Sequence, residues 1–153
     1  MKHHSILKYQ IIMFIIMTLV GISLNPMNIL AYDFNHLYPS LTLFYGGLLM
    51  ASNMIWAHEL VHFFYAGTFN IIVFCTGVLL SIFISIFLLR SQLFVDDKQW
   101  IKRMISHHST AITTTKKLLK KNKNIKQNSK LYTLAKTIID NQKQEIRIMK
   151  SLL

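Results

Sequence analysis

The stretch MISHHSTAITTT, Met104 to Thr115, is followed further along the chain by LAKTIIDNQKQEIRIMKSLL, Leu134 to Leu153. Both stretches repeat apolar residues at the spacing of an α-helix, which predicts two helices packed as an antiparallel hairpin. Met104, His107 and His108 share one side of the first helix, and the second helix brings Met149 near them. Imidazoles and thioethers that meet across a hairpin indicate a metal site, with Met104, His107, His108 and Met149 as its predicted ligands.

The two histidines of this site are not equivalent. Adjacent side chains on a helix diverge by about 100°, so both imidazoles cannot easily bind one ion unless a partner helix lies between them. His108 is the better inward ligand. Gln142 and Glu145, on the second helix, are expected to orient an imidazole by hydrogen bonding.

The ends of the predicted hairpin are also marked in the sequence. Asp96 or Asp97 is a suitable amino-terminal cap for the first helix, and Asn128 or Ser129 for the second. The run NKNIKQN, residues 122–128, is expected to form the turn. The residues expected to face inward are Trp100, Ile101, Met104, Ile105, His108, Ile112 and Leu119 on the first helix and Leu131, Leu134, Ala135, Ile138, Ile146, Met149 and Leu153 on the second.

The patterns MI-x-HH-x-x-A-I and LA-x-x-I-I-x-x-Q-x-x-E-I-x-x-M resemble the helical family called domain of unknown function 305. The resemblance implies a ferritin-like half-bundle and, since some exported members bind copper, copper as a cofactor. One branch of the family joins three membrane spans to the hairpin through a segment similar to LLRSQLFVDDKQWIKRMISHHS, Leu88 to Ser109. The resemblance therefore implies a three-span domain at residues 1–92 and a hairpin domain with the HH motif at residues 93–153.

The chain departs from the soluble copper-binding pattern at one position. In that pattern a methionine commonly follows the histidine pair by about two helical turns, and Thr114 stands at that place here. The soft-ligand set is therefore smaller, which puts high copper affinity in doubt.

Composition independently predicts a membrane protein. Hydrophobic residues make up 52% of the 153 residues and charged residues only 15%. Three apolar segments, residues 11–30, 41–65 and 71–89, each approach the roughly twenty residues that a helix needs to cross a bilayer. The first segment is expected to be a retained anchor, because no A-x-A-like cleavage site follows it. The predicted fold is all-α, with three transmembrane helices followed by an antiparallel helical hairpin.

Charge is concentrated in the carboxyl-terminal part. From Gln92 onward 14 Lys and Arg stand against 4 Asp and Glu, so this part carries +10 of the net charge of +11. A solvated helical face explains such a tail, and contact with anionic lipid is a further possibility. No groove-reading motif accompanies the charge, so no specific nucleic-acid partner is expected.

Two lines of argument disagree on orientation. The basic residues Arg90, Lys98, Lys102 and Arg103 beside the last predicted span favour a cytoplasmic hairpin by the positive-inside rule. The family resemblance instead implies an integral protein of the cytoplasmic membrane with the hairpin on the exported side. We follow the family and predict an exported hairpin.

The second predicted span contains HELVH, residues 58–62, which matches H-E-x-x-H. In a zinc metalloprotease two histidines one turn apart hold the metal and the glutamate activates water. Such an enzyme also needs a third protein ligand, and the other predicted spans contain no Asp or Glu to supply it. An intramembrane zinc metalloprotease is therefore the most remote of three hypotheses, and no enzymatic activity is expected.

The same span has a stripe with a spacing of four residues. Met50, Met54, His58 and His62 follow one another down one helical face and form a possible intramembrane metal stripe. The alternative is that the methionines fill gaps and the histidines hydrogen-bond within the bundle. Glu59 is costly within a span and needs a partner, for which His62 is the nearest candidate.

The sequence leaves three hypotheses for the function. The first is a membrane protein that binds or hands on copper through its hairpin. The second is a metal-free, membrane-anchored helical module for interaction or oligomerisation, and the third is the protease. Because two helices alone bury little surface, the hairpin is expected either to form a homo-oligomer, as a dimer of hairpins with four helices, or to pack against the membrane domain, and the lipid bilayer is a further partner.

Overall fold

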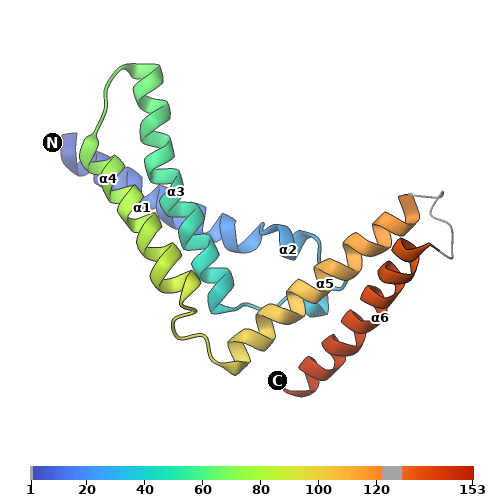
Figure 1. The fold of residues 1–153 in the computed structure, drawn as a ribbon. Coiled ribbons are helices and arrows are strands. Elements are labelled where there is room, and N and C mark those ends of the chain that lie inside the picture. Colours follow the sequence, from blue (N-terminus) through green and yellow to red (C-terminus); the bar gives the residue numbers. More distant parts are fainter. Residues whose placement is uncertain (1, 122–128) are drawn as a thin grey trace. The chain divides into compact units, whose positions relative to one another are not determined.

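The computed structural model describes residues 2–121 and 129–153, with only the backbone described for residues 2–6 (Figure 1). Every regular element in these ranges is a helix, which confirms the all-α prediction. The predicted turn at 122–128 and its candidate cap Asn128 lie outside the described residues. Two compact units form, each from two separate parts of the chain.

We call the first the apolar unit, Met1–Leu24 with Leu41–Val95, and the second the hairpin unit, Asn25–Ser40 with Asp96–Leu153. The predicted boundary between residues 92 and 93 stays a prediction. Contacts place residues 25–40, which we call the linker, with the hairpin.

The apolar unit consists of α1 (Lys2–Ser23), α3 (Leu41–Ala66) and α4 (Ile71–Phe83), and α4 continues as the π-helical turn η2 (Ile84–Arg90). Helix α3 packs against both α1 and α4. A Cβ atom on Gly47 would lie 2.8 Å from the Thr18 backbone oxygen of α1, and one on Gly77 would lie 2.9 Å from the Trp56 backbone nitrogen of α3. Such close backbone approach through small residues is typical of helices packed in membranes.

Two helical segments in the described residues are long and apolar enough to cross a membrane, Leu7–Ile29 and Ile71–Arg90. These correspond to the first and third predicted spans. The second prediction is correct as a helix, because α3 covers residues 41–66, but α3 does not qualify as a candidate span. The polar residues Asn53, His58, Glu59 and His62 lower its mean hydropathy.

The hairpin unit contains α5 (Asp97–Lys121) and α6 (Lys130–Ser151), which lie side by side in Figure 1. The predicted caps are confirmed at both helices: the Asp96 carboxylate accepts a hydrogen bond from the Gln99 backbone, and the Ser129 hydroxyl accepts one from the Tyr132 backbone. The linker adds two short helices, α2 (Pro26–Ile29) and η1 (Phe34–His36).

The core of the hairpin unit contains most of the predicted inward residues but not all. Ile101, Ile105, Ile112, Ile146 and Met149 form one buried cluster, with Met104 packed against it. Trp100, Leu131 and Leu134, predicted to face inward, are 53%, 47% and 56% exposed, whereas Ile139 is buried. Helix α6 therefore has two neighbouring apolar stripes, and only one of them meets α5.

Candidate functional site

The imidazole of His108 lies inside the hairpin, where it joins α5 to α6. Its Nδ1 lies 2.8 Å from the Met104 carbonyl oxygen one turn earlier. Its Nε2 lies 2.7 Å from the Glu145 carboxylate on α6. Both ring nitrogens of His108 therefore have an oxygen partner, one on α5 itself and one on α6.

The other predicted ligands surround His108 unevenly. His107 is exposed, with its ring centroid 5.7 Å from that of His108. Met104 and Met149 belong to the core that holds the two helices together. Gln142 is half-buried, and its Oε1 atom has no hydrogen-bond partner. The structure thus brings one imidazole and two methionines to the inner part of the hairpin and leaves the other imidazole outside.

This arrangement has a direct consequence for metal binding. A metal-bound imidazole needs one unprotonated ring nitrogen, and both nitrogens of His108 already have partners. Among the side chains that the structure describes, in residues 7–121 and 129–153, no group of three or more His, Cys, Asp or Glu is placed to hold a metal ion. The metal roles of Met104, His107, His108 and Met149 stay a prediction.

A set of hydroxyl contacts that the sequence did not predict fixes the linker to α5. The Ser109 hydroxyl accepts a 2.7 Å hydrogen bond from the Tyr32 backbone and lies 3.0 Å from His36 Nδ1. The Ser106 hydroxyl donates to the His36 carbonyl at 2.8 Å, and Thr110 donates to the Met27 carbonyl at 3.1 Å. One flank of α5 therefore contacts the linker through polar side chains, and the neighbouring apolar flank contacts α6.

Two side chains of the linker have shifted proton affinities. Burial lowers the pKa of His36, and the charge of Lys150 lowers it further. The hydrogen bond and charge of Lys116 lower the pKa of Tyr32, whose hydroxyl lies 2.6 Å from the ammonium nitrogen. On α5, burial also lowers the pKa of Arg103.

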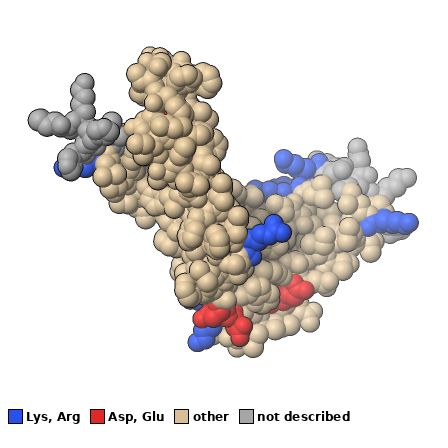
Figure 2. Space-filling model, turned by 60° about the vertical axis from the view of Figure 1, so that its left-hand side comes forward, with Lys and Arg blue, Asp and Glu red and all other residues tan. Residues whose placement is uncertain are grey.

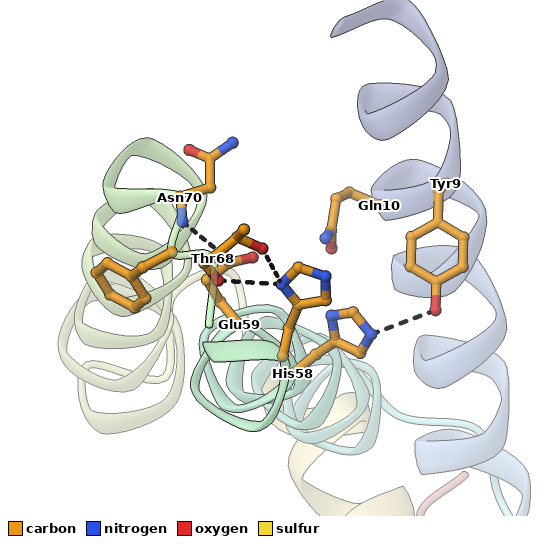
Figure 3. Close-up of a pocket in the computed structure, with 8 residues that line it drawn as sticks. Tyr9, Gln10, His58, Glu59, Thr68 and Asn70 are labelled. Carbon is orange, nitrogen blue, oxygen red and sulfur yellow. Dashed lines mark hydrogen bonds between the residues drawn. The ribbon is translucent and has the colours of Figure 1, made fainter. Parts of the chain in front are cut away.

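His58, Glu59 and His62 of the HELVH motif line a cavity of about 480 Å³ in the apolar unit, which we call the polar cavity. Figure 3 shows Tyr9 and Gln10 on α1 across from His58 on α3, with Thr68 and Asn70 closing the cavity from the segment before α4. The His58 and His62 rings stack with centroids 6.4 Å apart. Met50 and Met54 do not line this cavity. The predicted stripe is therefore divided, with only its histidines at the cavity.

Glu59 has a different partner from the one predicted. Its carboxylate accepts a 2.6 Å hydrogen bond from the backbone of Asn70, and the residue is only 6% exposed. Asn70 is also the amino-terminal cap of α4, accepting from the backbones of Ile72 and Val73. The expectation that His62 would partner Glu59 is wrong, because a carboxylate is favoured at a helix amino terminus, where backbone N–H groups lack partners. Glu59 connects α3 to the start of α4.

Comparisons with known proteins identify the family of the hairpin. The model of the family described as domain of unknown function (DUF305) matches residues 89–153, which contain both long helices of the hairpin. Over 144 residues the chain is 32% identical to an uncharacterized protein, L153, of Acanthamoeba polyphaga mimivirus, covering 94% of this chain and 91% of that protein. No solved structure matches the chain significantly.

Proposed function

This chain belongs to the DUF305 family, and we propose that it is a membrane-anchored helical module that assembles with a second copy through its hairpin. The apolar unit is the anchor, and the hairpin unit is the assembling part. The main support for the proposal is an exposed apolar face on the hairpin. The proposal assigns no catalytic step.

The surface of the apolar unit supports a bilayer location. Only 11% and 17% of the two candidate spans are buried, whereas the core helix of a soluble protein is mostly buried. Ile12, Leu19 and Leu79 are among the large apolar side chains that are about half exposed or more. Between residues 9 and 89 the only charged side chains are Asp33 and Glu59. Tan atoms make up most of the face in Figure 2, and blue and red atoms are few.

Linker contacts support α3 as a third span. The linker follows α1, and residues 96–153 follow α4, yet the two segments are joined by the hydrogen bonds at Ser106, Ser109 and Thr110. They therefore lie on one side of the membrane. If α1 and α4 both cross and both end on that side, the chain must cross back between them, and α3 is the long helix there. Its residues His58, Glu59 and His62 then lie at the polar cavity.

We place the hairpin on the exported side of the cytoplasmic membrane and the amino terminus inside. A topology reporter fused after Leu153 is expected to be active outside the cytoplasm, and activity only inside would reverse this orientation. Alkaline carbonate extraction tests the anchor itself. The protein is expected to stay with the membranes, and release into the supernatant would remove the bilayer from the proposal.

The assembling surface is one side of the hairpin, on which α5 and α6 both carry exposed apolar side chains. We call it the open face; its large apolar residues are 42 to 62% exposed, and they are Trp100, Leu118, Leu131, Leu134, Ile148 and Leu152. Trp100 and Leu152 line one cavity together with Met149, so the outward residues of α5 and α6 share this side. An exposed apolar surface of this kind on a folded domain marks an interaction site.

The pattern on α6 favours a second copy as the partner. Leu131 and Leu152 are equally far from a point between Asn141 and Gln142, and the midpoint of Leu134 and Ile148 lies half a residue from that point. An antiparallel pair of α6 helices centred there therefore places apolar residues against apolar residues, as a two-fold interface requires. Thr137, Asn141 and Gln144, on or beside the stripe, are uncharged, and Glu145 adds one negative charge to it. Two hairpins joined in this way form a four-helix assembly.

A pair of double variants tests the assembly. Leu134→Lys with Ile148→Lys adds two charges to the open face, and Thr133→Lys with Ser151→Lys adds the same charges about 100° away on α6. Light scattering of the purified full chain in detergent is expected to show a dimer for the parent and the control. The open-face variant should dissociate at least roughly tenfold more readily. A monomeric parent, or a dimer unaffected by the open-face charges, would refute the interface.

Copper binding by Met104, His107, His108 and Met149 is a second proposal. It is supported by the two methionines, since Met149 belongs to the hairpin core and Met104, one turn before His108, packs against it. Copper would have to displace Glu145 from His108 Nε2. Titration of the purified chain with Cu(I) is expected to show binding that His107→Ala with His108→Ala removes. Identical titrations of parent and variant would refute copper binding at this site and leave only the metal-free module. A dimer and a melting temperature that chelators do not change would have the same meaning.

A further inference from the structure

The polar cavity of the apolar unit contains polar atoms without partners. His58 Nδ1 and Gln10 Oε1 are buried and make no hydrogen bond. The only contact of the His58 ring on its other nitrogen is a long one, 3.5 Å from Nε2 to the Tyr9 hydroxyl. A buried polar atom without a partner costs free energy, so these atoms indicate a missing ligand.

The chemistry of the lining selects a hydrogen-bond donor. His62 Nδ1 lies 3.2 Å from the Thr68 carbonyl oxygen and 3.3 Å from the Thr68 hydroxyl. The amide oxygen of Gln10 is an acceptor, and an unprotonated nitrogen of the His58 ring is another. The Glu59 carboxylate also lines the cavity, and none of the lining residues that the structure describes is a Lys or Arg. Several acceptors and one carboxylate, with no opposing cation, complement a primary ammonium group.

The polar cavity adjoins an apolar groove. A second cavity, also of about 480 Å³, shares Gln10 and Asn70 with the first. It runs between α1 and α4, and α3 contributes only Ile55 to it. Apart from the shared residues and Thr76, its lining is apolar: Leu7, Ile11, Phe14, Ile55, Ile72, Val73 and Leu80. One end of the combined space suits a polar group and the other suits a hydrocarbon chain.

We propose that this combined space binds a membrane lipid whose headgroup carries a primary amine. The ammonium group lies in the polar cavity among Gln10, His58 and His62, and one acyl chain lies in the apolar groove between α1 and α4. The lipid supplies donors to the unpartnered acceptors and covers the apolar side chains of the groove. This inference rests on the membrane location in the proposed function and is independent of the open face and of copper.

Native mass spectrometry of the full chain, released from detergent with defined lipids, tests the headgroup. Phosphatidylethanolamine has the N–H donors, phosphatidylcholine has the same charge without them, and phosphatidylglycerol has no amine. The parent is expected to retain phosphatidylethanolamine at least roughly fivefold better than either other lipid. Equal retention of phosphatidylethanolamine and phosphatidylcholine, or preference for phosphatidylglycerol, would overturn the assignment.

Matched substitutions locate the bound lipid. Thr76→Trp fills the groove, and Leu79→Trp places the same ring on an exposed position of α4 that does not line it. Gln10→Leu removes an acceptor from the cavity, and Gln144→Leu makes the same change on the exposed side of α6. Retention is expected to fall several-fold in the first variant of each pair only. Unchanged retention in Thr76→Trp, or a metal ion bound stoichiometrically in place of lipid, would refute the site.

Two further measurements separate the possible failures. Circular dichroism shows whether each variant retains the helix content of the parent, so that loss of lipid is not loss of fold. Carbonate extraction shows whether the chain is in the membrane. A chain that is extracted defeats the proposed function, whereas a membrane-resident chain without lipid preference defeats this inference alone.

Discussion

In the hairpin unit, α5 and α6 meet through large apolar side chains, whereas in the apolar unit α1, α3 and α4 meet where side chains are smallest. Ile105 and Ile112 are completely buried between the hairpin helices. Gly47 and Gly77 instead let backbones approach directly, and the Ser81 hydroxyl donates to the Ser52 hydroxyl across α3 and α4 at 3.0 Å. The difference teaches that the hairpin is stabilised by removing apolar groups from water, while the other unit depends on close fit between helices whose outward faces are already apolar.

The largest effect is expected from removing apolar volume in the hairpin. Ile112→Ala leaves a cavity in the core and should lower the free energy of unfolding of the hairpin unit by about 2–5 kcal/mol. Ile29→Ala makes the same change at a position that is 67% exposed and should have little effect. Trp100 fluorescence in a Trp56→Phe background reports on the hairpin unit. Similar losses for the two variants would contradict this account of the core.

Adding volume should damage the other unit. Gly47→Ala places a methyl group against Thr18 and Ile22 on α1 and should cost about 1–3 kcal/mol. Gly46→Ala is its control, because nothing lies within 4 Å of a Cβ atom there. Thermal unfolding in detergent, followed by Trp56 fluorescence in a Trp100→Phe background, measures both. Equal melting temperatures would mean that α1 and α3 do not depend on this close contact.

A smaller effect is expected at the ion pair within the hairpin. Glu145 is half exposed, so water screens its attraction to His108, and Glu145→Gln should cost about 1 kcal/mol or less. A double-mutant cycle with His108→Gln isolates the interaction between the two side chains. Added salt should reduce the coupling. A coupling energy of zero at low salt would show that the contact does not stabilise the hairpin.

The smallest effect concerns pH at the linker. The pKa of His36 is lowered in the folded state, so protonation favours the unfolded state. Neutral His36 therefore contributes its full stability above pH about 6.5, the pKa of histidine in the unfolded chain. That contribution is lost progressively as the pH falls below this value. The difference in stability between the parent and His36→Gln should therefore shrink on acidification. A difference that grows toward low pH would reverse the sign of this assignment.

The sequence predicts the helices of both units because their periodicity and caps are local properties. It does not predict which side of α6 meets α5. Leu134 and Ile139 belong to neighbouring stripes of similar apolarity, and only the tertiary contact with α5 selects the stripe that contains Ile139. Periodicity alone therefore assigned Leu134 to the wrong side.

Contacts between distant segments escaped prediction for a related reason. Ser106 and Ser109 resemble ordinary polar residues of an exposed helical flank, and nothing local indicates that the linker covers them. The partner of Glu59 is a backbone N–H group, which has no signature in residue identity. At the predicted metal site, the spacing of His107 and His108 indicates which side each ring occupies. Glu145 is expected from the sequence to orient an imidazole, but the sequence does not show that both nitrogens of His108 have partners, which leaves neither open to a metal ion.

The hydroxyl contacts of the linker have a consequence for work on the isolated part of the chain that matches the family. A fragment cut at residue 89, where the family match begins, contains Ser106, Ser109 and Thr110 but none of the backbone groups that they bind in the linker. Such a fragment would expose to solvent a surface of α5 that the linker covers in the whole protein. Its solubility and binding would then be those of an incomplete hairpin unit, and a peptide of residues 25–40 added in trans is expected to restore the missing contacts.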